Sequence, residues 1–200
     1  VIGTLNVLEV ARVLGIKKVV FSSTAAIYGS TSEPCLETDR PDPLNPYSVS
    51  KLAGENLMKM YNDLYGIETV SLRYFNVYGP RQAYKGQYAP VIGIFQKQKF
   101  EGKPLTIIGD GNQTRDFIHV ADVAHANMMV AEKNIVGVFN VGSSIEHSVN
   151  QIADLTNSPH GKTTMPSREG EARRSISDNS KLKNIGWQPR IGLEAWIAKQ

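Results

Sequence analysis

Apolar positions along the chain change their spacing from that of a helix to that of buried strands. Residues 2–14 carry apolar side chains at helix-like spacing, and Gly15 follows them as a stop signal, so they predict a helix. The run KKVVFSS at 17–23 is short and rich in β-branched residues, which predicts a buried strand.

A polar segment then separates this strand from a long helix. Residues 29–46 hold four prolines and several Ser, Thr and Asp, which is typical of a loop. Asn45-Pro46 is a helix-start signal, with Asn as the cap and Pro at the first helical position. We expect the helix to run over 46–65 with Gly66 as its C-cap, and IETVSLRYF at 67–75 to form a second buried strand.

The pattern becomes less regular after Gly79. The sequence LTIIGDGNQTRDFIHV predicts two short strands around a Gly-Asp-Gly turn, and VGVFNVG predicts a further strand at 136–142. Helices are expected at about 90–101, 120–132, from Ser148 to about 157, and more weakly at 178–185 and 192–199.

Alternation of helices and buried strands predicts an α/β fold, with a parallel sheet covered by helices. Ligands of such sheets bind at the carboxyl ends of the strands. Those ends are SSTAAIYG after the first strand and YFNVYGPR after the second, and the helix after the loop adds YSVSK. Three polar clusters should therefore meet at one edge, covered by the smaller portion after residue 80.

Composition and charge narrow the class of partner. The chain of 200 residues is 41% hydrophobic and 20% charged, which is ordinary for a globular protein. Its apolar runs are all shorter than the roughly 20 residues of a membrane span, so we expect no membrane partner. The net charge of +3 is mild and the basic residues are scattered. This disfavours a nucleic-acid partner and suits a small phosphate-bearing molecule.

Cysteine and histidine offer no metal site. The single cysteine, Cys35, excludes an internal disulfide and a cysteine zinc cluster, and it favours a reducing, cytoplasmic setting. Cys35 lies in the Pro-rich loop without a neighbouring histidine, so a nucleophilic role is disfavoured. The four histidines lack metal-ligand spacing, and for His119 a structural hydrogen bond is the expected role.

Six motifs follow one another along the chain: SSTAAIYG, YSVSK, RYFNVYGPR, GDGNQTRDFIHVADVA, REGEARRSISDNSK and GWQP. In this order they resemble those of the extended short-chain dehydrogenase/reductases, and within them the NAD-dependent UDP-sugar 4-epimerases. The resemblance covers nearly the whole chain and implies a Rossmann-like, doubly wound parallel sheet, an NAD cofactor, a UDP-sugar substrate and a transient 4-keto sugar.

The chain departs from the family pattern at its beginning. Family members open with a Gly-rich phosphate loop, and no GxxGxxG occurs here. At roughly 30 residues per βαβ unit, about 90 residues are absent. The start at Val1, within a helical pattern, suggests a fragment. We therefore expect the chain alone to bind NAD poorly and to be inactive.

The resemblance also implies a division of the chain and a pairing of two copies. Residues 1–80, with the strand near 136–142, match the second half of an NAD-binding domain, and residues 81–200 match mainly the substrate-binding domain. Family members often pair through helices equivalent to 2–14 and 46–65, so a homodimer is expected. The alternative is that both helices only cover the sheet.

Tyr47 and Lys51 lie one helical turn apart, which places them on one face of the helix. Tyr47 matches the catalytic tyrosine of the family. A phenol has a pKa of about 10, and a cation lowers it, which is the role that the family gives to the lysine at Lys51. Lys51 also matches the residue that binds the nicotinamide ribose. The alternative is an ordinary surface pair on a helix.

Thr24 matches the active-site Ser or Thr that bridges the sugar hydroxyl and the tyrosine, since a hydroxyl both donates and accepts. Ala25 and Ala26 follow it, where family 4,6-dehydratases carry an Asp-Glu pair. Alanines cannot act as acid or base, which argues against dehydration. Ser22 and Ser23 match cofactor contacts through backbone or side chain, or else only complete the strand end.

Further positions match cofactor and substrate contacts of the family. Tyr74 and Phe75 would line the nicotinamide, or belong partly to the core. Ala89-Pro90 replaces the Asn-Asn pair of many epimerases, so a contact there would come from backbone such as the Val91 amide. The other expected substrate contacts are Asn76 to a phosphate or sugar oxygen, Arg115 and Arg168 to the diphosphate or ribose, and Glu171 to a ribose hydroxyl.

Ser175 falls where the family has a residue that gates sugar size, and a small side chain there predicts room for an N-acetyl group. TNSPHGKTTMP, between the helix at 148–157 and Arg168, looks short for the family and predicts an altered pocket wall. Asp116 is expected to hold a loop. Arg173 and Arg174 are expected in solvent or in ion pairs.

Two other functions remain open from the sequence. One is a related family enzyme, such as a UDP-glucuronate epimerase or decarboxylase, although no extra cation or Ser/Thr cluster for a carboxylate can be placed. The other is a non-catalytic nucleotide-sugar binding or scaffolding protein. An intact set of Tyr47, Lys51 and Thr24 argues against the second.

Overall fold

A computed structural model of the whole chain describes residues 1–86, 89–167 and 172–200. Its first layer is a parallel sheet in the order β1-β2-β6, formed by β1 (Lys18–Thr24), β2 (Glu68–Tyr74) and β6 (Gly137–Val141). The strands at 17–23, 67–75 and 136–142 are thereby confirmed within two residues.

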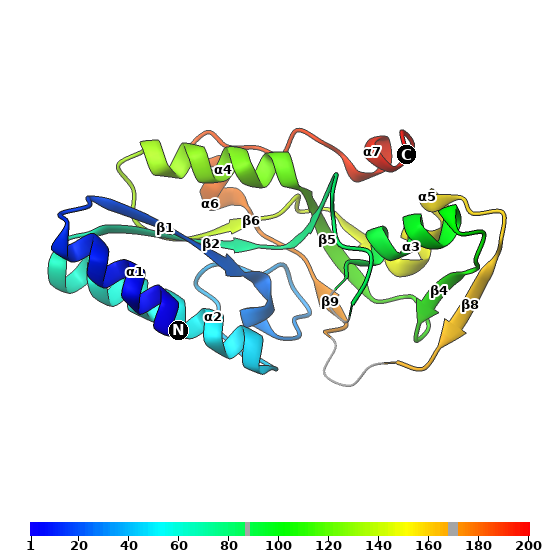
Figure 1. Cartoon of the computed structure of the whole chain (residues 1–200), viewed down its shortest axis with the longest axis horizontal. Helices are drawn as coiled ribbons and strands as arrows, with labels where there is room; N and C mark the ends of the chain where they lie inside the picture. The colour runs from blue at the N-terminus through cyan, green and yellow to red at the C-terminus, as the bar shows by residue number, and fades with distance from the viewer. Residues whose placement is uncertain (87–88, 168–171) are drawn as a thin grey trace.

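Helices cover both faces of this sheet (Figure 1). α1 (Ile2–Val13) and α2 (Pro46–Tyr65) lie on one face, and α4 (Val120–Glu132) lies on the other, where α6 (Ser180–Lys183) adds Leu182 to the same apolar core. The expected α/β arrangement is confirmed.

α2 begins and ends where its local signals predict. The Asn45 side chain accepts a hydrogen bond from the Ser48 amide, and the Ser48 hydroxyl oxygen accepts one from the Asn45 amide, which completes a capping box. Pro46 occupies the first helical position, and Gly66 at φ 68° provides the left-handed C-cap. Leu8, Ala11, Met58, Tyr61 and Ile67 form the core between α1, α2 and the sheet.

A second sheet follows in chain order. It consists of β3 (Asn76–Tyr78), β5 (Thr114–His119), β7 (Glu146–Ser148) and β9 (Arg174–Ser175), with β5 pairing with all three others. β4 (Leu105–Ile108) pairs instead with β8 (Lys162–Met165). The two strands expected around the Gly-Asp-Gly turn are thus present, but they pair with distant segments and not with one another.

Three helices pack on this second part of the molecule: α3 (Val91–Phe100), α5 (Val149–Thr156) and α7 (Leu193–Ile197). α5 begins after Ser148, as the sequence predicts, and Ser148 caps it in a capping box with Gln151. The apolar side chains of these helices and of β4 and β5 form one core around Phe95, Leu105 and Ile152. This core is separate from the cores on the first sheet and holds β5 in place.

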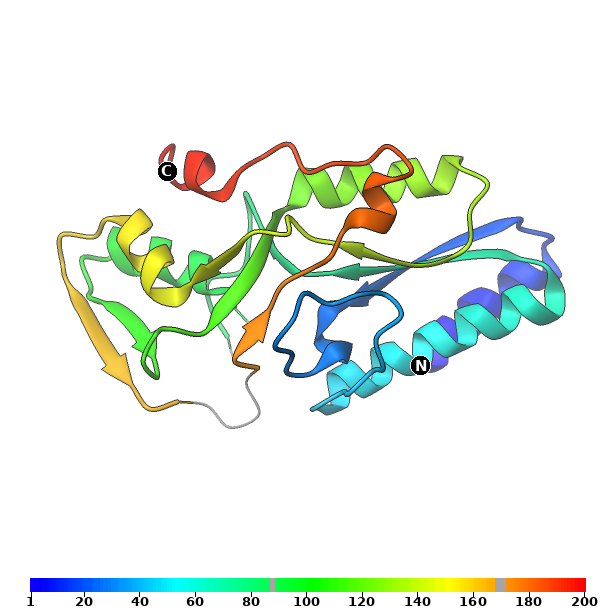
Figure 2. The same ribbon diagram turned by 180° about the vertical axis from the view of Figure 1, so that it is seen from behind.

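The Pro-rich loop connects the two parts. After β1 the chain forms a short 3₁₀-helix, η1 (Ala25–Tyr28), and the loop then runs beside the segment that contains β9 (Figure 2). The Cys35 amide donates to the Ile176 carbonyl at 2.9 Å, and the Asp178 amide donates to the Cys35 carbonyl at 3.0 Å. These bonds bring β9 to the carboxyl edge of the first sheet.

Cys35 is 1% exposed, and burial raises the pKa of its thiol. A nucleophilic cysteine needs the thiolate, so both findings accord with a structural role. Within the described ranges, every helix is too short or too polar to cross a bilayer.

Candidate functional site

Two hollows open at the carboxyl edge of the first sheet, and both are lined by Asn76 and Arg115. The smaller has a volume of about 260 Å³ and the larger about 460 Å³. The smaller is lined by Thr24, Ala25, Ala26, Gly29, Leu44, Asn45, Tyr74, Phe75, Asn76, Arg115, Ala172 and Ser175. The larger is lined by Tyr47, Asn76, Val77, Ala89, Pro90, Val91, Arg115, Phe117 and Val149.

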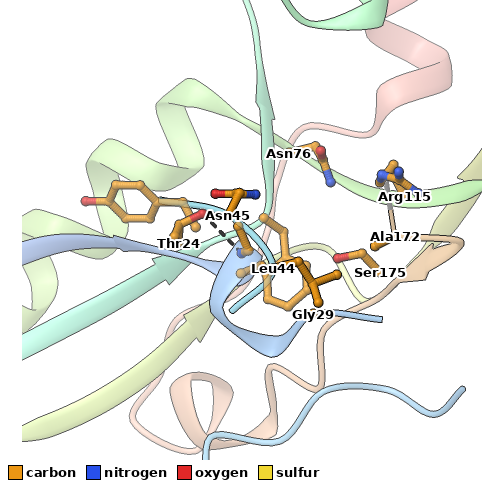
Figure 3. A pocket seen from close by; sticks show the side chains of 12 residues that line it. Thr24, Gly29, Leu44, Asn45, Asn76, Arg115, Ala172 and Ser175 are labelled. Carbon is orange, nitrogen blue, oxygen red and sulfur yellow. Dashed lines mark hydrogen bonds between the residues drawn. The ribbon is translucent and has the colours of Figure 1, made fainter. Parts of the chain in front are cut away.

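The smaller hollow lies between the two parts of the molecule. Figure 3 shows Thr24, Leu44 and Asn45 on one side of it and Asn76, Arg115 and Ser175 on the other. The three polar clusters predicted from the sequence therefore meet at this edge, and the portion after residue 80 contributes one wall.

Tyr47 and Lys51 occupy the first two turns of α2. Tyr47 is 52% exposed and lines the larger hollow. The Lys51 ammonium lies 5.8 Å from the centre of the Tyr47 ring and donates a 2.8 Å hydrogen bond to the Ser22 carbonyl. β1 thus holds a positive charge beside the ring of an accessible tyrosine.

Thr24 ends β1 and lines the smaller hollow. Its hydroxyl oxygen accepts a 3.2 Å hydrogen bond from the Ala26 amide and so caps η1. In that bond the Thr24 hydroxyl acts as the acceptor, so its own proton stays available to donate. Thr24 can therefore pass a proton without a change of charge.

Ser22 and Ser23 point to opposite faces of the sheet, as alternate residues of a strand do. The Ser22 hydroxyl lies 3.0 Å from the Tyr74 hydroxyl, which in turn donates to Asn127 of α4 at 2.9 Å. Ser23 is 3% exposed and donates to Glu55 inside the protein. A cofactor contact at Ser23 would therefore come from its backbone.

Phe75 belongs to the core and also lines the smaller hollow. It is 4% exposed, stacks on Tyr28 with ring centres 6.3 Å apart, and belongs to a small core with Ile27 and Cys35. Phe75 and Tyr74 also line the smaller hollow. Both residues can therefore present ring surface to a bound molecule.

Asn76, Arg115 and Ser175 come from three adjacent strands of the second sheet. Asn76 donates to the Asp116 carbonyl at 3.1 Å, and Arg115 donates to the Thr114 carbonyl at 2.8 Å. Ser175 pairs with Arg115 in the register of β5 and β9. A guanidinium and an amide shared by both hollows suit a phosphate group placed between them.

Val91 is the first residue of α3 and lines the larger hollow. Backbone amides in the first turn of a helix lack helical partners, so they can donate to a ligand. Arg168 and Glu171, also expected to bind substrate, lie outside the described residues.

Several residues have the structural roles expected of them. Asp116 is fully buried and accepts hydrogen bonds from Ser143, Ser144 and Ser177, which holds the loop after β6. His119 accepts from the Ala121 amide as the cap of α4. Arg173 and Arg174 both form ion pairs, as expected. Arg173 pairs with Asp110 at 2.7 Å and Arg174 with Glu146 at 2.8 Å.

Sequence patterns missed part of the lining. Gly29, Leu44, Asn45 and Ala172 all line the smaller hollow, and none was a candidate. Leu44 and Asn45 had a usable signal, because residues just before the first turn of α2 must lie near Tyr47. In the part of the chain that the structure describes, acidic, His and Cys side chains form no cluster of three suited to a metal ion.

The sequence of this chain is similar to those of known sugar-nucleotide epimerases. Residues 1–142 match the model of the NAD dependent epimerase/dehydratase family. The chain is 43% identical over 206 residues to a putative UDP-glucose 4-epimerase of Methanocaldococcus jannaschii, covering 100% of this chain and 67% of the relative. It is also 34% identical to a UDP-glucuronate 4-epimerase of Thermodesulfobacterium geofontis.

Solved structures agree with the fold. The UDP-glucose 4-epimerase of Thermotoga maritima has a TM-score of 0.94 and 38% identity, covering 99% of this chain and 66% of the other. The UDP-N-acetylglucosamine 4-epimerase of Methanobrevibacter ruminantium has a TM-score of 0.94 and 34% identity, covering 98% of this chain and 65% of the other. The expected Rossmann-like fold is confirmed, and the chain spans about two thirds of the length of these relatives.

Proposed function

Because the chain belongs to the NAD-dependent epimerase/dehydratase family, we propose that the complete protein inverts carbon 4 of a UDP-hexose. The family match confirms the resemblance read from the motifs. The proposed substrates are UDP-glucose and UDP-galactose, or their N-acetylhexosamine counterparts. One observation carries the proposal: Tyr47 with its Lys51 cation and Thr24 line hollows that share Asn76 and Arg115.

Tyr47 is the proposed base. With Lys51 beside it, the phenolate takes the proton of the sugar 4-hydroxyl, directly or through the Thr24 hydroxyl, and returns it at the end of the cycle. Ala25 and Ala26 line the smaller hollow together with Thr24 and supply no second acid or base, which restricts the proposed reaction to oxidation and reduction at one carbon.

The residues present fit the nicotinamide end of NAD. Lys51 is held at the end of β1 by the Ser22 carbonyl, in reach of a ribose hydroxyl, and Tyr74 and Phe75 offer ring surface. Bound NAD⁺ supplies reversible hydride acceptance at carbon 4 of the sugar. Ser22 and Ser23 complete the proposed cofactor contacts at this strand end.

Arg115, with Arg168, is proposed to grip the diphosphate while the 4-keto sugar turns and presents its other face. Asn76 and the Val91 amide would donate to phosphate or sugar oxygens, and Glu171 would accept from a ribose hydroxyl. Ser175 adjoins Arg115 and lines the smaller hollow, so its small side chain leaves room for an N-acetyl group.

The proposal also assigns roles to the two parts of the chain. Residues 1–80 with β6 would belong to the cofactor half, and residues 81–200 mainly to the substrate half. Two copies would pair through α1 and α2, whose outer faces carry exposed apolar side chains. The single buried cysteine accords with a cytoplasmic protein.

A UDP-glucuronate 4-epimerase is the second candidate, because such an enzyme is among the relatives. A sugar carboxylate needs an added cation or hydroxyl cluster near the sugar, whereas the described lining of the smaller hollow has Arg115 as its cation. A scaffold without catalysis would retain bound nucleotide sugar but turn over none.

The test uses the complete protein that contains this chain. UDP-glucose, UDP-N-acetylglucosamine and UDP-glucuronate are incubated separately, and the 4-epimers are resolved by proton NMR. We expect conversion of either of the first two and its loss in Tyr47→Phe. Comparable rates with the first two would support the Ser175 argument. Conversion of UDP-glucuronate alone would favour the second candidate, and no conversion with bound NAD would favour the scaffold.

A further inference from the structure

A buried ion pair joins the helix that carries Tyr47 to the strands beneath it. Glu55 of α2 and Arg73 of β2 have side chains that are each 5% exposed. The guanidinium grips the carboxylate twice, with Nε 3.0 Å from Oε1 and Nη2 2.7 Å from Oε2. Neither residue lines a hollow at the carboxyl edge, so the reaction chemistry does not use this pair directly.

Arg73 belongs to one row of residues across the sheet, and Glu55 contacts that row from α2. Ser23 of β1, Arg73 of β2 and Asn140 of β6 stand side by side in the strand register. Ser23 donates to Glu55, and Arg73 donates through Nη1 to the Tyr28 hydroxyl at 2.8 Å. The Tyr28 hydroxyl in turn donates a hydrogen bond to the Asn140 side chain at 2.7 Å, which extends the network to β6. Burial raises the pKa of Tyr28, which keeps this hydroxyl a donor.

This row directly precedes the row that forms the site. The next residues in register are Thr24 and Tyr74, both of which line the smaller hollow. On the helix side, Glu55 follows Lys51 by four residues and Tyr47 by eight, so the three share one face. Glu55 therefore lies about one helical turn after Lys51 and about two turns after Tyr47.

Directional bonds of this kind fix the position of a helix more strictly than apolar packing does. A buried ion pair is often no more stabilising than apolar side chains of the same volume, because both charges lose their hydration. Apolar contacts tolerate small sliding and rotation of a helix, whereas a two-pronged guanidinium–carboxylate contact fixes distance and angle together.

A close approach next to the pair supports the same role. A Cβ built on Gly54 would lie 2.4 Å from the Phe21 ring of β1, so α2 and β1 touch there as closely as a glycine allows. Gly54 thus sets the distance between α2 and β1. Glu55 lies next to it and is placed to set the position of α2 along β1.

We propose that Glu55 and Arg73 are positioning residues of the candidate active site, which hold α2 in register so that Lys51 reaches the Ser22 carbonyl and Tyr47 faces the larger hollow. This inference rests on the proposed function. It predicts that weakening the pair misplaces Tyr47 and Lys51 while the phosphate-facing residues on β3 and β5 stay in place.

The experiment compares variants of the complete protein with rates expressed per bound NAD, so that unfolded protein is not counted. In Glu55→Gln and Arg73→Lys we expect kcat to fall about 10- to 100-fold, a loss typical of small misplacements, with KM for the sugar nucleotide within about twofold of wild type. Amide hydrogen exchange in the first two turns of α2 should quicken.

Met58→Ala is the matched control, because Met58 lies three residues beyond Glu55 on α2, is 1% exposed and packs only in an apolar core. It should lower the unfolding temperature and leave kcat per bound NAD near wild type. Tyr28→Phe removes the hydroxyl that links Arg73 to Asn140, and it provides a milder variant, with a smaller fall in kcat, if Glu55→Gln does not fold.

Wild-type kcat per bound NAD in the folded Glu55 and Arg73 variants, or in Tyr28→Phe if those two do not fold, would overturn the positioning role. An equal loss of kcat in Met58→Ala would also overturn it, since general loosening of α2 would then suffice. Failure of the proposed function is distinguished separately, because the wild-type protein would then convert neither UDP-glucose nor UDP-N-acetylglucosamine, whereas the change of amide exchange in α2 could still be measured.

Discussion

At the scale of single residues, Lys51 has the contact that most directly supports a catalytic role. Its ammonium is held by a backbone carbonyl at the end of β1, and the Phe21 and Tyr47 rings lie 5.1 and 5.8 Å from it. A lysine on an exposed helix surface would have no such fixed position. The charge therefore has a fixed position beside the Tyr47 ring.

Lys51→Met tests this charge while keeping most of the side-chain volume. We expect kcat of the complete protein to fall by about 10²-fold or more, because a positioned acid–base group contributes on that order. Steady-state kinetics with the preferred UDP-hexose would measure it. Lys59→Met, two turns further along α2 with a 76% exposed side chain, should leave kcat unchanged. Equal losses in both variants would contradict the assignment.

At the scale of elements, the contact between α2 and β1 depends on a glycine. Gly54→Ala would place a methyl group against the Phe21 ring, so the helix or the ring must move. We expect a loss of about 1–3 kcal/mol in the free energy of unfolding, as in other overpacked cores. Urea denaturation would measure it.

Gly3 offers the matched helix position, because a Cβ there meets no atom within 4 Å. Gly3→Ala should be neutral or should stabilise the protein by up to about 1 kcal/mol, since alanine favours a helix. A Gly54→Ala protein as stable as Gly3→Ala would show that α2 does not press on β1.

An ion pair between β7 and β9 should make stability depend on pH. Arg174 holds the pKa of Glu146 below its ordinary value. A carboxyl with a lowered pKa in the folded state adds stability above its ordinary pKa, and this is lost as pH falls through the lowered value. Glu146→Gln should therefore reduce the stability difference between about pH 7 and about pH 3.

Chemical denaturation at both pH values would measure this difference. Glu132→Gln, at the exposed end of α4, is the control and should change it little. An unchanged pH dependence in Glu146→Gln would show that the pair contributes nothing to the folded state.

Sequence patterns predicted the elements with strong local signals and missed those defined by distant partners. α2 was predicted at both ends because Asn45, Pro46 and Gly66 act locally. β9 has two residues and β8 is exposed along its length, so neither has an apolar pattern to find. The charges of Glu55 and Arg73 gave no sign of burial, because burial of each depends on the other.

At the scale of the whole molecule, the outer face of α1 stands out. Val7, Val10 and Leu14 lie along one side of this helix and are 59%, 56% and 69% exposed. Exposed apolar surface of this kind is suited to contact with another protein surface. It accords with the homodimer that the family resemblance implies.

Val10→Glu tests the pairing in the complete protein. We expect the sedimenting mass to fall to that of one subunit, because a buried unpaired carboxylate would oppose association. Analytical ultracentrifugation would measure it. Phe100→Glu is the control, since Phe100 is 90% exposed on α3 and away from α1. A dimeric Val10→Glu protein would exclude α1 from the interface.

The backbone bonds of Cys35 with Ile176 and Asp178 join the loop after β1 to the strand that carries Ser175. We expect these bonds to pass order gained by one segment to the other. Binding of cofactor and of sugar nucleotide should then be linked, each tightening the other by the same factor. The two ligands of the proposed reaction would share one free energy of coupling.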